Sequence, residues 1–113
     1  MQNSERRKDI RTPISIPACV VRRGGAEALQ MIDASYRGLF LRFASAPNTR
    51  ELLKLRIDLP NRQLEINAVV VRTVFDALGR PGVGLRFFAL NGQDKADWEG
   101  FVSEHLHRYA RAA

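Results

Sequence analysis

The chain has 113 residues, of which 45% are hydrophobic and 27% are charged, and this length fits one domain around one buried core. Its formal net charge of +6 favours an anionic partner such as a nucleotide, a nucleic acid or an acidic protein. The single cysteine, Cys19, excludes an internal disulfide and a multi-cysteine zinc site, and it fits a reducing cytoplasm.

The first thirteen residues are polar and basic, with little that could anchor a fold. Met1 and Ile10 are the large apolar side chains in this stretch, and it lacks the apolar run of a signal peptide. Residues 1–23 carry six basic and two acidic side chains, and so hold most of the net positive charge. We therefore predict a flexible basic arm over residues 1–13 and a folded domain over residues 14–113.

Six segments after the arm have the features of β-strands. The clearest alternation of apolar and charged residues runs over residues 53–59, which is typical of a strand with one buried face. Pro17 lies in the first segment, where proline favours a sheet edge or the entry to a strand. The fifth segment is apolar on both faces near Val69, which predicts a bend or a bulge. The predicted strands are 14–22, 28–36, 38–43, 53–59, 64–75 and 83–90.

The hydrophobic period changes after the sixth strand. From Trp98 to Tyr109, large side chains recur at intervals of three and four residues, which predicts a helix over about residues 91–111. We interpret this stripe as the face that packs on the core. The order of elements favours a mainly β fold, a six-stranded antiparallel β-barrel with a C-terminal α-helix. The outer side of the helix leaves a homodimer contact open.

The sequence contains no set of residues typical of an enzyme active site. His105 and His107 lie two residues apart on the predicted helix, so they face different directions and cannot bind one metal ion together. The sequence around Ser35 lacks the glycines of a nucleophile elbow. The glycines between Gly79 and Gly84 precede a strand rather than a helix, unlike those of a phosphate-binding loop. We therefore expect a binding protein without catalytic activity, metal or cofactor.

Two short motifs remain. Arg7 and Arg11 form R-x-x-x-R at the end of the arm, which is a weak signal in a chain so rich in arginine. Asp33, Ser35 and Gly38 form D-x-S-x-x-G, for which this composition gives on the order of a few hundredths of a match per chain. The alternatives are a solvated run of charge for the arginines and turn residues that bond their own backbone for the second motif.

The two motifs, in this order, resemble those of the PilZ domain family. The resemblance covers nearly the whole chain, because residues 11–14 and 82–87 resemble the first and last barrel strands of the family. It implies a six-stranded antiparallel barrel with a C-terminal helix. It also implies a bacterial receptor for the second messenger cyclic di-GMP, because the best-known members bind that nucleotide.

The resemblance also implies which residues bind the ligand. An arginine fork matches the two acceptors of a guanine Hoogsteen edge, and a carboxylate accepts hydrogen bonds from the donors on the opposite edge. A serine hydroxyl can donate to a phosphate, and a glycine lets the backbone approach. The implied ligand residues are Arg7, Arg11, Asp33, Ser35 and Gly38, with Arg6 and Arg37 as additional candidates for a phosphate.

The expected partners are cyclic di-GMP and a downstream protein, because a chain of this length has no separate output domain. An arm that closes over the nucleotide would present a new surface to that protein. By resemblance, the output is motility, exopolysaccharide and biofilm formation, virulence or pilus assembly. The sequence leaves open which of these applies and whether one or two nucleotides bind.

Two alternative functions stay open. The first is an adaptor with the same fold that acts only through protein contacts. The second is a basic barrel that binds single-stranded nucleic acid, which requires aromatic side chains displayed beside the charge. Phe40 and Phe88 are the candidates for such a display, so nucleic acid is the less favoured partner. No apolar stretch could span a bilayer, so we expect a bacterial cytoplasmic protein without membrane insertion.

Overall fold

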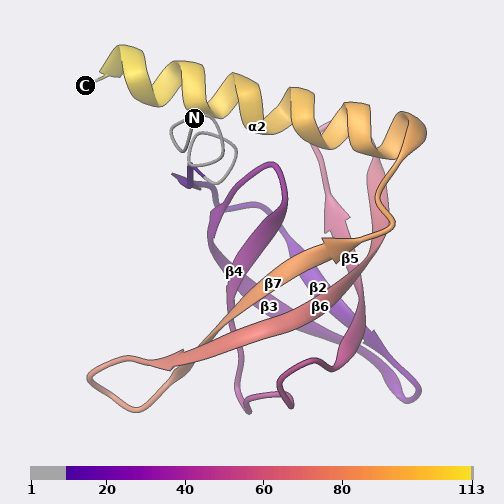
Figure 1. Ribbon diagram of the computed structural model, residues 1–113, viewed down its shortest axis with the longest axis vertical. Helices are drawn as coiled ribbons and strands as arrows, with labels where there is room; N and C mark the ends of the chain where they lie inside the picture. Colours follow the sequence, from indigo (N-terminus) through magenta and orange to yellow (C-terminus); the bar gives the residue numbers. More distant parts are fainter. Residues whose placement is uncertain (1–9, 113) are drawn as a thin grey trace.

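The computed structural model describes residues 10–112, with side chains as far as Arg108. Its strands form one antiparallel sheet that closes on itself, because β4 pairs both with β7 and with β3. The result is the predicted barrel of six strands, β2 to β7, which the two-residue β1 precedes, and the helix lies across one end of it (Figure 1). The elements are β1 (Thr12–Pro13), β2 (Ala18–Arg22), β3 (Gly25–Ala34), β4 (Gly38–Arg42), β5 (Leu52–Asp58), β6 (Gln63–Phe75), β7 (Pro81–Phe88) and α2 (Gly92–Ala112).

The prediction of one continuous strand over residues 14–22 is wrong. Two separate strands of this segment pair with β3, first the two-residue β1 and then β2. Residues 14–17 between them do not belong to a strand. Pro13 and Pro17 cannot donate backbone hydrogen bonds, which accounts for the interruption. The carbonyl of Pro17 instead accepts a hydrogen bond from the amide of Asp58, at 3.0 Å.

The predicted arm is also shorter than expected at its C-terminal end. Thr12 is 1% exposed and opposes Ala34 in β3, and Pro13 opposes Asp33. Strand pairing thus places both residues in the folded domain, and Thr12 is buried there as well. Residues 1–9 of the predicted arm, with Arg6 and Arg7, lie outside the residues that the structure describes.

The barrel core is filled from alternate residues of the strands. In β5, Leu53, Leu55 and Ile57 are buried and the residues between them are more exposed, as the alternation predicted. The expected irregularity in β6 is confirmed, because its register with β7 shifts between Val70 and Arg72. Beyond this bulge, β6 leaves the core and continues into a long hairpin with β7.

Helix α2 closes one end of the barrel through its predicted apolar face. Trp98, Phe101 and Val102 are buried, and the indole ring of Trp98 packs edge-on against Phe87 with ring centroids 5.3 Å apart. Such pairs add specific geometry to the burial of apolar surface. Among the described residues, no helix has the length and apolar character that crossing a membrane requires.

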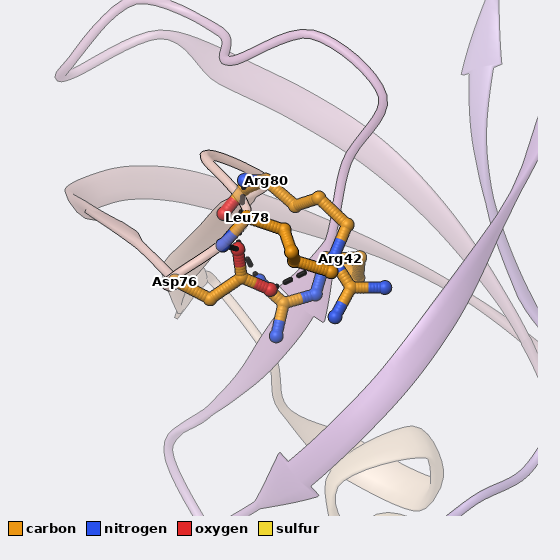
Figure 2. A network of polar contacts seen from close by, with 4 residues as sticks. All are labelled: Arg42, Asp76, Leu78 and Arg80. Atoms are coloured by element: carbon orange, nitrogen blue, oxygen red, sulfur yellow. Dashed lines mark hydrogen bonds and ion pairs between the residues drawn. The ribbon is translucent and has the colours of Figure 1, made fainter.

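Asp76 organises the turn of the β6–β7 hairpin, as Figure 2 shows. Its Oδ1 accepts hydrogen bonds from the amides of Leu78 and Arg80, each at 2.9 Å, and its Oδ2 accepts one from Arg80 Nε at 2.7 Å. Arg42 Nη1 of β4 lies 3.7 Å from the same Oδ2. The hydrogen bond from the Arg80 amide is the main cause that lowers the pKa of Asp76, against a smaller opposite effect of desolvation.

We expect the hairpin network to weaken in acid. A pKa that is lower in the folded state means that the network stabilises the fold above the ordinary aspartate pKa, and that this contribution is lost as the pH falls through the lowered value. Asp76→Asn should therefore unfold at a lower temperature than the wild type at pH 7, and this difference should shrink as the pH falls below about 4 and through the lowered pKa. Thermal unfolding across a pH series measures this. Glu104→Gln on α2 is the control, and a difference that does not depend on pH would contradict the interpretation.

Candidate functional site

The loop between β3 and β4 is held by hydrogen bonds within the D-x-S-x-x-G motif. The amide of Ser35 donates to the carbonyl of Gly38 at 3.0 Å, and the amide of Arg37 donates to Ser35 Oγ at 3.3 Å. Ser35 is 3% exposed, and its hydroxyl still has a proton to donate. The turn-forming role that the sequence left open is therefore present, and it does not exclude a bond from Ser35 to a ligand.

The helix and β7 hold the same loop from outside. Trp98 Nε1 donates a buried hydrogen bond to the carbonyl of Ser35 at 3.0 Å. On the other side, the amide of Phe87 donates to the carbonyl of Arg37 at 2.8 Å. Two carbonyls of the loop are thus fixed by separate elements, so the loop has its shape before any ligand is bound.

Gly38 lies at a position where no side chain fits. A β-carbon added there would overlap the carbonyl oxygen of Leu85 and would lie 3.3 Å from the Cα atom of Arg86. Both neighbours belong to the backbone of β7, so neither can rotate away as a side chain could. The last position of the motif therefore needs glycine for space, because β4 packs too closely on β7 for any β-carbon.

An ion pair joins the two motifs. Arg11 Nη1 lies 3.0 Å from Asp33 Oδ1, and the two side chains keep 35% and 27% of their surfaces exposed. The strand pairing explains the contact, because Pro13, two residues after Arg11, directly opposes Asp33. Residues far apart in the sequence thus meet on the outside of the barrel, and both remain accessible to a ligand.

A cavity of about 450 Å³ lies between β7 and α2, next to the loop that joins β3 to β4. Its charged lining consists of Arg37, Arg86, Lys95 and Glu99, so the positive side chains outnumber the acidic one. The sequence had singled out Arg37 alone from this set. Arg86 directly opposes Gly38, and its signal in the sequence was only its outward position in β7.

The structure thus brings together most of the predicted ligand residues. Arg11 and Asp33 form an ion pair, Ser35 and Gly38 shape the loop, and Arg37 lines the neighbouring cavity. Arg6 and Arg7 fall outside residues 10–112. In that range, no group of histidine, cysteine, aspartate and glutamate side chains is arranged to hold a metal ion.

Comparison with protein families gives one match. A model of the PilZ domain matches residues 5–104, which includes both motifs and most of the helix. PilZ domains are binding or adaptor domains, and no catalytic family is indicated. No curated protein sequence matches the chain.

Several solved structures share the fold. The inhibitor of motility MotI/DgrA from Bacillus subtilis has a TM-score of 0.76 and 20% identity, over 90% of this chain and 50% of that one. The PilZ domain of YcgR from Escherichia coli, solved with c-di-GMP, has a TM-score of 0.67 and 13% identity, over 91% of this chain and 92% of that one. MrkH of K. pneumonia, also solved with c-di-GMP, has a TM-score of 0.78 and 15% identity, over 92% of this chain and 54% of that one. The chain therefore spans about half the length of MotI/DgrA and of MrkH.

The close contact at Gly38 leads to a stability prediction. Gly38→Ala should destabilise the fold by roughly 1–3 kcal/mol, because the added methyl group forces β4 away from β7. Gly24→Ala in the β2–β3 turn is the matched control, because a β-carbon there would have no heavy atom within 4 Å. Urea unfolding followed by circular dichroism measures both variants. Equal midpoints for the two variants would show that the barrel tolerates the extra carbon.

Proposed function

The chain belongs to the PilZ domain family, and on that basis we propose that it is a receptor for cyclic di-GMP that passes the signal to a protein partner. The ion pair between Arg11 and Asp33 is the observation that carries the proposal, because it unites the two motifs in one exposed site. YcgR and MrkH, which share the fold, were solved with this ligand. The proposed activity is binding without catalysis, in the bacterial cytoplasm.

The proposed recognition uses groups that match the edges of guanine. The Arg11 guanidinium has five N–H donors, and one of them donates to Asp33. Other N–H groups can therefore donate to O6 and N7 of a guanine base. The Asp33 carboxylate keeps acceptor positions for the N–H groups on the opposite edge of a base. Arg37 and Arg86, on the wall of the adjoining cavity, can attract the phosphates. The ordered loop at Ser35 limits the entropy that binding costs.

The proposed signal passes through the N-terminal arm. Arg7 takes the first arginine position of R-x-x-x-R and would bind the nucleotide from residues that precede β1. Residues 1–9 would then close over the ligand and form, with it, a surface for a downstream protein. Motility and exopolysaccharide synthesis are the proposed outputs, since MotI/DgrA is an inhibitor of motility and another protein of this fold comes from a cellulose-synthesising bacterium.

Calorimetric titration with cyclic di-GMP tests the proposal. The wild type should bind with saturation at micromolar affinity or better, which corresponds to about 8 kcal/mol or more. Arg11→Ala should weaken binding by roughly tenfold to a hundredfold or more, because it removes a bidentate contact and leaves Asp33 without its partner. Arg23→Ala, which removes an exposed arginine from the β2–β3 turn, should bind like the wild type, and GTP should give no saturable signal.

Two results would argue against a cyclic di-GMP receptor. The first is the absence of both binding heat and thermal stabilisation at high ligand concentration, which would favour an adaptor that uses only protein contacts. The second is oligonucleotide binding that falls steeply with salt and is unaffected by Arg11→Ala, which would favour nucleic acid as the ligand.

The proposed relay makes a separate prediction about the arm. On saturation with cyclic di-GMP, amide hydrogen exchange in residues 1–9 should become slower, because these residues close over the ligand. Arg7→Ala should reduce this protection more than it changes exchange in β5. Exchange of residues 1–9 that is the same with and without bound ligand would mean that the signal takes another route.

A further inference from the structure

The end of the β6–β7 hairpin has a strand edge without a neighbour. β7 is bonded on both sides as far as Pro81, whose carbonyl accepts a hydrogen bond from the amide of Phe43 at 3.1 Å. In contrast, β6 pairs with β5 only up to Val69, and Val70 makes its last backbone bonds to the segment before β5. On the side away from β7, the described chain provides no strand beside residues 71–75. We call these five residues the free edge.

Two residues of the free edge direct their backbone groups away from the hairpin. The amide of Asp76 donates to the carbonyl of Arg80 at 3.0 Å, so Asp76 bonds across the hairpin. Backbone groups along an antiparallel strand alternate between its two sides, and those of Thr73 and Phe75 therefore point outward. Each of these two residues offers one N–H and one C=O group. Such an edge is a template for another strand.

The same stretch of chain exposes apolar side chains. In the part of the chain that the structure describes, seven large hydrophobic side chains are exposed, and four of them lie within residues 71–78. Figure 1 shows the hairpin projecting from the barrel, away from α2. Proteins protect single edges with lysine or proline, and the free edge contains neither. A cluster of this kind indicates an interaction surface. The four side chains are Val71, Val74, Phe75 and Leu78.

The sequence of the free edge is complementary to itself. When two copies are placed antiparallel with Val74 opposite Val74, Thr73 of each copy lies opposite Phe75 of the other. This register matches all the outward backbone groups of these two residues, which gives four hydrogen bonds. It also sets Arg72 of each copy opposite Asp76 of the other, so unlike charges face each other. A register centred on Thr73 or on Phe75 sets Arg72 opposite an apolar side chain instead.

We propose that a second copy of this chain pairs with the free edge, so that the two hairpins form one symmetric sheet with Val74 on the two-fold axis. The proposal goes beyond the receptor function and requires no bound nucleotide. It places the homodimer contact on the hairpin rather than on the outer side of the helix. Because the paired segments are short, the dimer is weak and reversible, with a dissociation constant of roughly 10 µM to 1 mM.

Sedimentation equilibrium of the full chain without ligand tests the association. The wild type should change from monomer to dimer as its concentration rises through that range. Val74→Lys should raise the dissociation constant by roughly tenfold or more, because it places two ammonium groups opposite each other on the axis. Leu78→Lys makes the same change on the same hairpin, beyond the paired residues 72–76, and should dimerise as the wild type does. Equal thermal unfolding of the two dilute variants separates lost association from lost folding.

Cysteine cross-linking tests the register. In a Cys19→Ser background, Val74→Cys should form a disulfide-linked dimer on mild oxidation. Directly opposed residues that do not bond each other have Cα atoms about 4.5 Å apart, which is within the reach of a disulfide. Leu78→Cys in the same background is the control. Leu78 is more exposed than Val74, at 78% against 46%, but it lies off the axis and should cross-link more slowly.

Four results would overturn the proposed dimer. The first is a wild type that stays monomeric at every concentration. The second is a dissociation constant that Val74→Lys leaves unchanged, which would place the contact elsewhere, for example on α2. The third is equal cross-linking of the two cysteine variants. The fourth is slow amide exchange of Thr73 and Phe75 in the dilute monomer, which would mean that residues of the same chain cover the edge. Calorimetry with cyclic di-GMP tests the receptor function independently of all four.

Discussion

The close approach of β4 to β7 at Gly38 is the constraint on which the rest of the site depends. Because no β-carbon separates the two strands there, the loop before Gly38 runs next to the backbone of β7 and can receive the hydrogen bond from Phe87. The same placement puts the carbonyl of Ser35 within reach of Trp98 on the helix. A single steric condition thus helps to fix the loop and lets β4 pair closely with β7, which is the pairing that closes the barrel.

The arrangement of arginines explains how a net positive chain concentrates its charge. Arg62, for example, bonds both Asp94 and Asp97 of the helix, at 2.7 and 2.8 Å, and thereby ties the β5–β6 turn to α2. Arg37 and Arg86, on the cavity beside the motif loop, have no carboxylate within ion-pair distance in residues 10–112. A site bordered by such side chains attracts anions over a longer range than a contact does, and this attraction raises association rates.

The sequence was sufficient to predict an element where the pattern depends only on neighbouring residues. Alternation over residues 53–59 and the stripe that begins at Trp98 correctly indicated β5 and the buried face of α2, because each depends only on the spacing of neighbouring residues. Pro17 indicated a sheet edge or the entry to a strand, and β2 begins at the next residue, but the separate strand β1 could not be predicted, since it depends on pairing with the distant β3. Arg72 and Arg86 look like ordinary outward residues of strands, and only the register of β4, β6 and β7 places them beside the motif.

The position of Trp98 gives the protein an optical property of its own. It is the chain's single tryptophan, it is fully buried, and its indole N–H is bonded to the loop that holds D-x-S-x-x-G. Its fluorescence therefore comes from one environment, which couples the helix to the motif loop. A change in that emission reports a change at the contact between the helix and the loop, without any label and in the unmodified chain.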